Sequence, residues 1–309
     1  MAFVNSMFAN RLRKNAKTRL KWARRQGLTA FRLYDLDMPD FPFAVDQYGE
    51  FIHVMEYPRR RSLNDGSATQ KREEVLAGIR EVLAVDDARI FTKTHEPKPW
   101  GREQYERHGR KSTLTTVEEN GLRFEVNLSD YLDTGLFMDH RDTRQRVRGE
   151  VAGKRFLNLF AYTGAFSVYA LAGNASRTTT VDLSQHYLEW GERNFKLNGY
   201  GAGREHTLVR ADALEWVESA REKYDVIVLD PPSFSVSKRM EKRFEVQRHH
   251  RRLIERVLLL LAPGGELYFS TNFLRFELDR GLQPVEELTP RSIPQDFRRE
   301  VHRCWRFKT

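Results

Sequence analysis

The stretch Tyr224-Asp-Val-Ile-Val-Leu-Asp-Pro-Pro-Ser-Phe234 decides the fold class of this chain. Its four consecutive apolar residues, Val226 to Leu229, are typical of a strand that is buried on both faces of a parallel sheet. Asp230 and two prolines follow, and the carboxyl ends of such strands border the ligand crevice of an open α/β sheet. Asp-Pro-Pro by itself also occurs as a plain strand exit and turn. The stretch therefore predicts a buried strand that ends either at a ligand site or at a simple turn.

An alternation of strands and helices surrounds this stretch, from about residue 154 to the C-terminus. It predicts an α/β fold with a mostly parallel, twisted sheet. Asp182 and Asp212 follow two of the other strands, as Asp230 follows its own. An acid after a strand also serves as a helix cap, so each one alone has that second explanation. The expected strands span residues 155–160, 177–182, 206–210 and 224–229.

The turn after the first strand, Tyr162-Thr-Gly164, limits the kind of ligand. A dinucleotide-binding fold has Gly-x-Gly-x-x-Gly here to receive a pyrophosphate, whereas this turn supplies one glycine. Asp182 lies roughly 20 residues beyond the turn, where such folds place the carboxylate that binds a ribose. A nucleoside without phosphates therefore fits better, and we predict S-adenosylmethionine. Its ribose would meet Asp182, its adenine Asp212 and its methionine part Gly164.

These residues resemble the Rossmann-fold RNA methyltransferases, and specifically the 7-methylguanine-forming C-terminal half of the bifunctional bacterial 23S rRNA methyltransferase family RlmKL. The likeness covers nearly the whole chain. Beyond the turn and the acids, it includes Met7-Phe-Ala-Asn-Arg-Leu-Arg-Lys14, Asp130-Tyr-Leu-Asp-Thr-Gly-Leu-Phe137, Asp139-His-Arg141 and Gln295-Asp-Phe297. The resemblance implies a Rossmann-like class I methyltransferase fold and methyl transfer to N7 of a guanine in 23S rRNA or a precursor large ribosomal subunit. The half that forms 2-methylguanine has no counterpart here, so we expect a free-standing version and a separate 2-methylguanine methyltransferase as a partner.

Candidate site residues follow from these motifs. The two prolines carry no N–H and leave carbonyl acceptors beside Asp230, while an aromatic ring can stack on a base. The expected catalytic residues are Asp230, Pro231, Pro232 and Phe234. Asp139 and Arg141 enter the cofactor site by the resemblance, and no metal is expected. The expected cofactor-binding residues are Asp139, Arg141, Asn158, Phe160, Tyr162, Thr163, Gly164, Asp182, Leu183, Asp212, Ala213 and Asp230.

Three positions depart from the family pattern. His249 stands where an acid is expected, Ser233 replaces a threonine, and Thr271-Asn-Phe-Leu274 lacks a basic pair after Asn272. We expect these departures to alter the RNA pocket and to leave the cofactor site intact.

Composition agrees with an RNA partner. The 309 residues carry a net charge of +9, and neutralising phosphates releases counterions and drives association. No apolar run is long enough to span a bilayer, and the single cysteine, Cys304, excludes an internal disulfide, so we expect a soluble cytoplasmic protein without a membrane partner.

Basic residues concentrate near the N-terminus, between Arg11 and Arg25, with no acid before Asp35. Phe8, Leu12 and Trp22 recur at a helical spacing, so we expect a helix with one apolar side and a basic side that faces outward. A merely solvated basic helix is the other explanation. The expected RNA-binding residues are Arg11, Arg13, Lys14, Lys17, Arg102, Lys238, Arg239 and Arg248.

A different rhythm in the first half predicts a smaller domain ahead of the methyltransferase domain. Residues 43–57 alternate around a Tyr-Gly turn and predict a hairpin, 69–83 predict a helix, and 112–128 predict strands around Glu119-Asn-Gly121. We therefore expect a basic helix plus a small α+β RNA-binding domain over residues 1–145. A Rossmann-like S-adenosylmethionine-dependent domain is expected over residues 146–309.

The target atom can be narrowed by chemistry. Methylation of a pyrimidine carbon needs a thiolate that adds to the ring, and we interpret Cys304 as a packing residue. Guanine N7 has an exposed lone pair and no proton, so direct in-line displacement needs positioning and no general base. One alternative is methylation of an exocyclic amine, adenine N6 or guanine N2, or of a glutamine amide, although such enzymes usually place the aromatic residue directly after Pro-Pro, where this chain has Ser233. The other is a non-catalytic RNA-binding ribosome-assembly factor.

Overall fold

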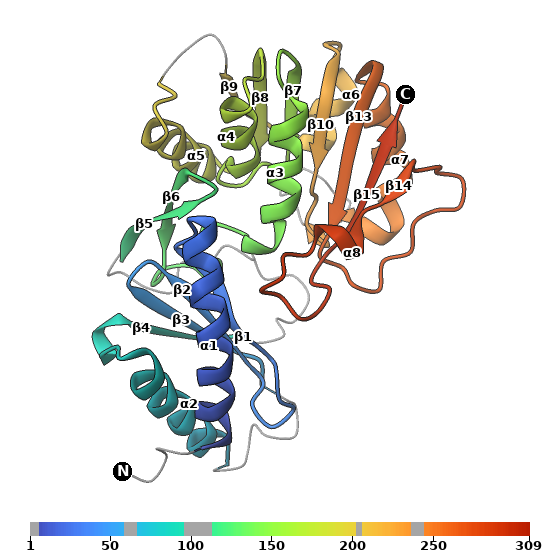
Figure 1. Cartoon of the computed structure of the whole chain (residues 1–309). Helices are drawn as coiled ribbons and strands as arrows, with labels where there is room; N and C mark the ends of the chain where they lie inside the picture. Colours follow the sequence, from blue (N-terminus) through green and yellow to red (C-terminus); the bar gives the residue numbers. More distant parts are fainter. Residues whose placement is uncertain (1–5, 59–66, 96–112, 202–205, 236–243) are drawn as a thin grey trace. The chain divides into compact units, whose positions relative to one another are not determined.

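The computed structural model describes residues 6–58, 67–95, 113–201, 206–235 and 244–309 (Figure 1). The chain divides into two compact units that interleave along the sequence. The first unit comprises residues 1–121, 126–134 and 295–299, and the second comprises 122–125, 135–294 and 300–309. The expected assignment of RNA binding to residues 1–145 and of cofactor binding to residues 146–309 concerns function, and it stays a prediction.

The first unit begins with helix α1 (Met7–Gln26), which confirms the expected basic helix. The Ser6 side chain accepts the Ala9 amide at the start of α1, and Gly27 ends the helix in the left-handed region with φ of 65°. Phe8 and Leu12 are fully buried, so α1 has the expected apolar side.

A four-stranded sheet packs against α1 and α2 (Ser67–Leu83) in the first unit. Its strands lie in the order β1-β2-β3-β4, of which the first three are antiparallel and the last pair is parallel. The hairpin predicted around Tyr48-Gly49 is confirmed, and Gly49 has φ of 61°. The strands are β1 (Ala30–Asp35), β2 (Phe43–Tyr48), β3 (Phe51–Glu56) and β4 (Ile90–Thr94), with a short 3-10 helix η1 (Asp87–Arg89) before β4.

A separate hairpin of β5 (Leu114–Glu119) and β6 (Leu122–Asn127) follows. Asn120 and Gly121 form its turn, both with positive φ, as two-residue hairpin turns require. The expected turn at Glu119-Asn-Gly121 is thereby confirmed.

The second unit is built on a seven-stranded sheet in the order β14-β15-β13-β10-β7-β8-β9. From β13 to β9 the neighbouring strands are parallel, and β15 is antiparallel to β13. Two short strands, β11 (Phe234–Ser235) and β12 (Phe244–Glu245), pair apart from this sheet. The strands of the large sheet are β7 (Arg155–Leu159), β8 (Arg177–Asp182), β9 (His206–Arg210), β10 (Tyr224–Leu229), β13 (Leu261–Thr271), β14 (Glu286–Glu287) and β15 (Arg303–Lys308).

Helices cover both faces of this sheet (Figure 1). Val226 and Val228 of β10 pack on the face covered by α3 and α4, while Ile227 and Leu229 pack on the face covered by α6 and α7. This explains the uninterrupted apolar run of β10, because both of its faces are buried. The helices of the second unit are α3 (Arg141–Glu150), α4 (Ala165–Ala172), α5 (Gln185–Leu197), α6 (Ala213–Ser219), α7 (Val246–Leu258) and α8 (Thr289–Ser292), with a 3-10 helix η2 (Met138–His140) before α3.

The mostly parallel sheet with helices on both faces confirms the expected α/β, Rossmann-like fold class. In the parts of the chain that the structure describes, no helix is both long and apolar enough to cross a membrane.

Candidate functional site

Three acids of the second unit lie at one edge of its large sheet. Asp182 ends β8, Asp212 follows β9, and Asp230 follows β10. These strands point the same way, with β7 between β8 and β10, so their carboxyl ends share one edge. Open α/β sheets bind their ligands at this edge. The fold thus gathers the acids that the strand spacing predicted as site residues.

The chain turns sharply between β7 and α4. Phe160, Tyr162 and Gly164 have positive φ of 56°, 51° and 71°. Such backbone is strained for phenylalanine and tyrosine, and strain of this kind gathers at functional sites where the surroundings enforce it. Oδ2 of Asp182 accepts the Tyr162 amide at 2.9 Å and so ties the turn to the end of β8.

Thr163 supports the turn from behind. The side chain is buried, and its Oγ1 donates a hydrogen bond to the Gly135 carbonyl at 2.6 Å. The Thr163 carbonyl in turn accepts a hydrogen bond from the side-chain amide of Asn194 at 3.0 Å. At Gly164 a Cβ would meet the Phe195 ring at 3.5 Å, an ordinary contact, so its positive φ favours glycine more than any lack of space.

Asp182 and Leu183 place two kinds of surface side by side. Oδ1 of Asp182 accepts the Ser184 amide at 2.8 Å, and Ser184 itself caps α5, so helix capping does not explain Asp182. Burial raises the pKa of Asp182 to about 6, against the opposing effect of the backbone amides that it accepts. Leu183 is 50% exposed. An acceptor beside an apolar side chain suits a sugar hydroxyl next to a flat ring.

Asp212 does cap a helix. Its Oδ1 accepts the Leu214 amide at 2.9 Å at the start of α6, and Ala213 is buried behind it. Helix capping, the alternative explanation of Asp212, is therefore confirmed. The cap uses only one of the two carboxylate oxygens.

Asn158 and Phe160 lie in and just after β7. The Asn158 side chain is 2% exposed and donates to Ser167 Oγ at 3.1 Å, which contacts Thr180 Oγ1 at 2.7 Å. Asn158 thus joins β7, α4 and β8 beneath the turn. The half-buried ring of Phe160 stacks on Phe244 with centroids 6.3 Å apart.

Beyond β10, the Asp-Pro-Pro segment presents an aromatic surface. Oδ1 of Asp230 accepts the Ser270 hydroxyl at 2.6 Å. Pro231 is buried and Pro232 half-buried, whereas Phe234 is 46% exposed and meets Phe273 edge-on at 6.1 Å. This segment therefore ends in an aromatic ring that is partly exposed to solvent.

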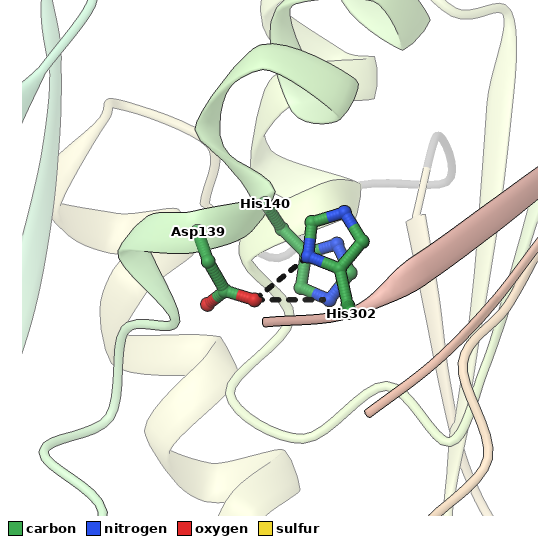
Figure 2. Close-up of side chains that lie close together, drawn as sticks. All are labelled: Asp139, His140 and His302. Carbon is green, nitrogen blue, oxygen red and sulfur yellow. Dashed lines mark hydrogen bonds and ion pairs between the residues drawn. The ribbon is translucent and has the colours of Figure 1, made fainter. Parts of the chain in front are cut away.

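A histidine cluster beside Asp230 was not predicted. Nδ1 of His302 lies 2.9 Å from Oδ2 of Asp139, and the rings of His140 and His302 are stacked with centroids 4.1 Å apart (Figure 2). Nε2 of His140 lies 3.5 Å from Oδ2 of Asp230. His140 stood inside the family motif Asp139-His-Arg141, but no local pattern pointed to His302.

Two arginines lie near this cluster. Arg141, a predicted cofactor residue, begins α3 and is buried. Arg144, also buried, donates to the Phe137 carbonyl at 2.8 Å. Burial would raise the pKa of Asp139, but His140, His302 and Arg144 outweigh it and hold that pKa well below its usual range.

The predicted RNA-binding residues fall in separate places. Lys14 and Lys17 are exposed on α1, and Arg11 is half-buried. Arg13 donates to Glu81 at 2.5 Å, so part of its charge is engaged by α2. In the second unit, Arg248 of α7 is exposed, with Glu245 at 3.5 Å. Arg102, Lys238 and Arg239 lie outside the described residues.

His249, the departure from an expected acid, keeps one function of an acid. Its Nδ1 accepts the Glu245 amide at 2.9 Å at the start of α7. Ser233, the second departure, donates to Oδ1 of Asn272 at 2.6 Å and so joins the Asp-Pro-Pro segment to the end of β13.

The chemistry of this edge fits S-adenosylmethionine. The cofactor carries a ribose diol, an adenine ring and a positive sulfonium. Acceptors for the diol and a counter-charge for the sulfonium are present in Asp182, Asp212 and Asp230, and Leu183 offers apolar surface to a ring. The strained turn at Tyr162 lets backbone approach a ligand closely.

Two curated relatives are proteins named ribosomal RNA large subunit methyltransferase K/L. The relative from Pseudomonas fluorescens is 47% identical over 305 residues, which cover 97% of this chain and 40% of the relative. The relative from Hahella chejuensis is 48% identical over 307 residues, which cover 98% of this chain and 42% of the relative. This chain thus spans about two fifths of the length of the curated relatives that it matches.

Two further comparisons concern the fold and the cofactor. The solved structure of SMU.776, complexed with SAH, is 26% identical to this chain with a TM-score of 0.81, and the match covers 100% of this chain and 82% of that one. SAH is the form that S-adenosylmethionine takes after losing its methyl group. The model of the S-adenosylmethionine-dependent methyltransferases matches residues 72–288. The chain belongs to this family, the S-adenosylmethionine-dependent methyltransferases, and uses that cofactor.

Proposed function

We propose that this chain transfers a methyl group to N7 of a guanine in 23S rRNA by direct in-line displacement. One observation carries the proposal, namely an exposed aromatic ring, Phe234, in the same segment as a carboxylate, Asp230, whose two oxygens already face donors. Such a pair can stack a base and stabilise positive charge without removing a proton.

The occupied carboxylate favours N7 over an exocyclic amine. Ser270 donates to Oδ1 of Asp230, and His140 lies next to Oδ2. An amine must lose a proton when it is methylated, whereas N7 reacts through a lone pair and leaves a cationic base. Asp230 would stabilise that cation, so that positioning and charge would supply the rate enhancement.

A carbon target has less support. Addition to a pyrimidine ring needs a thiolate near the base. Cys304 is fully buried in β15, and burial raises the pKa of its thiol. It packs among Val226, Val228 and Tyr268, as the sequence interpretation had it.

Asn272 gives a reason to prefer guanine over adenine. Its Oδ1 accepts the Ser233 hydroxyl, and its NH2 group can donate to an acceptor. Asn272 is exposed just after β13, the strand whose Ser270 donates to Asp230. Guanine presents the acceptor O6 beside N7, whereas adenine presents a donor amine there. The amide would therefore favour guanine.

The remaining site residues hold the cofactor, which supplies an electrophilic methyl group. We assign the ribose hydroxyls to Asp182 and the adenine to Leu183, Asp212 and Ala213. The Tyr162-Thr163-Gly164 turn, supported by Asn158 and Phe160, would adjoin the methionine part. Asp139 and Arg141 would border the same end.

The RNA substrate is inferred from the relatives' name and from charge. Lys14 and Lys17 of the first unit and Arg248 of the second are exposed cations suited to phosphates. Because the deep major groove of A-form RNA hides N7, the target base has to leave its stack. We place the protein in the cytoplasm, and the 2-methylguanine-forming partner stays a prediction.

The proposal is tested with RNA that lacks the target atom. A 23S rRNA transcript made with 7-deazaguanosine replaces each guanine N7 by C–H and leaves N1, N2 and O6 in place. Incorporation from labelled S-adenosylmethionine should fall to background, while a matched transcript made with 7-deazaadenosine should keep full incorporation. If the 7-deazaguanosine transcript is methylated as well as the unmodified one, the acceptor is an amine or a carbon and the proposal fails.

A further inference from the structure

Four titratable side chains from distant parts of the sequence meet beside the proposed methyl-transfer site. Asp139 and His140 belong to η2, Asp230 follows β10, and His302 precedes β15. Besides the contact of Asp139 with His302, Nε2 of His140 lies 3.8 Å from Oδ2 of Asp139 and 3.5 Å from Oδ2 of Asp230. In the function proposed above, His140 appears only as a neighbour of Asp230, and His302 has no role.

A metal ion is the first occupant to consider, because Asp139, His140 and His302 bring ligand atoms within 4.8 Å of one another. A histidine binds a metal through a lone pair in the plane of its ring. The two rings are nearly parallel, at 14°, and stacked with centroids 4.1 Å apart (Figure 2). One ion cannot lie in both of these planes, so the arrangement favours hydrogen bonding between the side chains.

Two hydrogen bonds hold the His302 ring, and one of them places a proton. Its Nδ1 faces the Asp139 carboxylate, which can only accept, so this nitrogen carries the proton. Its Nε2 lies 2.9 Å from the Ser292 hydroxyl, which also donates to the Thr289 carbonyl at 3.0 Å. His302 is fully buried and has both nitrogens satisfied. The His302 ring is therefore held in one orientation, and the His140 ring stacks on it.

His140 has a different balance. Its Nε2 faces two carboxylates, whereas its buried Nδ1 has no hydrogen-bond partner among the described residues. The proton of neutral His140 therefore belongs on Nε2, directed at Asp139 and Asp230. The titratable and charged groups facing the ring are these two acids, His302 and Arg144 of α3, and the α4 residue Phe166 meets it edge-on.

We propose that His140 is a positioning residue for methyl transfer. Its Nε2–H holds Oδ2 of Asp230, while the Ser270 hydroxyl holds Oδ1. Two donors on the two oxygens fix the rotation of the Asp230 carboxylate. This inference rests on the function proposed above, because it assigns Asp230 to the reacting base.

The charge of His140 matters to this role. Burial lowers the pKa of His140, helped by His302 and opposed by Asp230 and Asp139, so the ring is neutral at pH 7 and gains a proton only at lower pH. A second proton would place a buried positive charge next to Asp230. That positive charge would offset the negative charge of Asp230. The carboxylate would then stabilise the cationic methylated base less.

The test compares His140→Leu with His140→Gln in the full chain. The glutamine amide can still donate to Asp230 but does not titrate, and the leucine can do neither. Single-turnover methyl transfer to 23S rRNA is measured from pH 5.5 to 8, with cofactor affinity measured by calorimetry and His95→Gln, an exposed histidine of the first unit, as the control. We expect the leucine variant to lose about tenfold to hundredfold in rate at saturating cofactor and RNA. The glutamine variant should recover most of the rate at pH 7.5 and lose the decline that the wild type undergoes at acidic pH.

Wild-type rate in His140→Leu, or equal rates for the leucine and glutamine variants, would overturn the proposal. Stoichiometric metal that the purified wild type retains and His302→Ala loses would also overturn it, since the cluster would then be a metal site. NMR of the histidine nitrogens tests the contact between His140 and Asp230 without any turnover. We expect the Nε2–H tautomer for His140. We also expect its pKa to shift in Asp230→Asn. If the wild type makes no 7-methylguanine, the proposed function fails, while this spectrum still decides the contact.

Discussion

At the residue scale, Asp182 is the acid on which cofactor binding should depend most visibly. Its pKa of about 6 means that it loses its charge between neutral and mildly acidic pH. A neutral acid is a weaker acceptor for ribose hydroxyls, so affinity for S-adenosylmethionine should fall as pH falls through 6. Asp182→Asn should weaken binding by about tenfold to hundredfold at pH 7.5 and make it nearly independent of pH above 5. Calorimetry at pH 5 to 7.5 checks both.

The raised pKa of Asp182 also predicts how stability depends on pH, and this dependence is opposite in sign to that of cofactor affinity. The folded-state pKa of Asp182 is raised from 3.8, so the folded protein binds this proton more tightly than the unfolded chain between about pH 4 and 6. The contribution of Asp182 to the free energy of unfolding therefore decreases as pH rises through this window. Urea unfolding of the wild type and of Asp182→Asn should diverge there. If the free energies of unfolding of the two proteins change in parallel from pH 4 to 7, burial does not raise the pKa of Asp182.

Residues with a fixed distance from a strand end were predictable. Asp182, Asp212 and Asp230 follow from the spacing of strands, because parallel strands bring their ends to one edge. His302 was not predictable, since its partners Asp139 and Ser292 meet it only through tertiary packing. The site residues themselves remain predictions that the experiments above test.

At the scale of single elements, the start of α6 separates the two roles of Asp212. Asp212→Asn keeps an acceptor for the Leu214 amide and removes the charge, whereas Asp212→Ala removes both. We expect the alanine variant to lose about 1 kcal/mol of stability, as for other lost N-caps, and the asparagine variant to stay near the wild type. Both should bind S-adenosylmethionine more weakly. Equal cofactor affinity in all three proteins would leave Asp212 as a cap alone.

The exposed lysines of α1 are predicted to bind RNA phosphates. Lys14→Glu with Lys17→Glu should weaken binding to 23S rRNA and reduce the dependence of affinity on salt, since fewer counterions are released. A matched control, Lys154→Glu with Lys223→Glu, makes the same charge change before β7 and β10, at the edge of the sheet away from the acids. Filter binding over a salt series compares them. If the control weakens binding as much as the α1 variant, only net charge matters and α1 is a solvated basic helix.

Elements with a clear period were predictable, and those that run through turn residues were not. Strand β13 begins at Leu261 and passes through Pro263-Gly-Gly265. Its pairing with β10 shifts from Tyr224 opposite Leu261 to Val226 opposite Glu266. This irregularity accommodates three residues that in isolation indicate a loop.

At the scale of the whole molecule, the chain returns to its first unit near the C-terminus. Oδ2 of Asp296 accepts the Arg32 amide at 2.9 Å, and the Arg298 amide donates to Asp35 at 2.8 Å. The Arg32 guanidinium lies 4.3 Å from the centre of the Phe297 ring. Gln295-Asp-Phe297 was recognisable as a motif, but its partners lie far away in sequence, so no local pattern could indicate this pairing.

We have proposed that this chain methylates guanine N7 in 23S rRNA. The most direct test of this proposal is mass-spectrometric nucleoside mapping of 23S rRNA after incubation with this chain and S-adenosylmethionine, combined with borohydride and aniline cleavage, which breaks RNA at 7-methylguanine. We predict one 7-methylguanosine, made by the wild type and lost in Asp230→Ala with its fold intact by circular dichroism. A methyl group found instead on an amine or a carbon, or 7-methylguanosine formed equally by Asp230→Ala, would contradict the account.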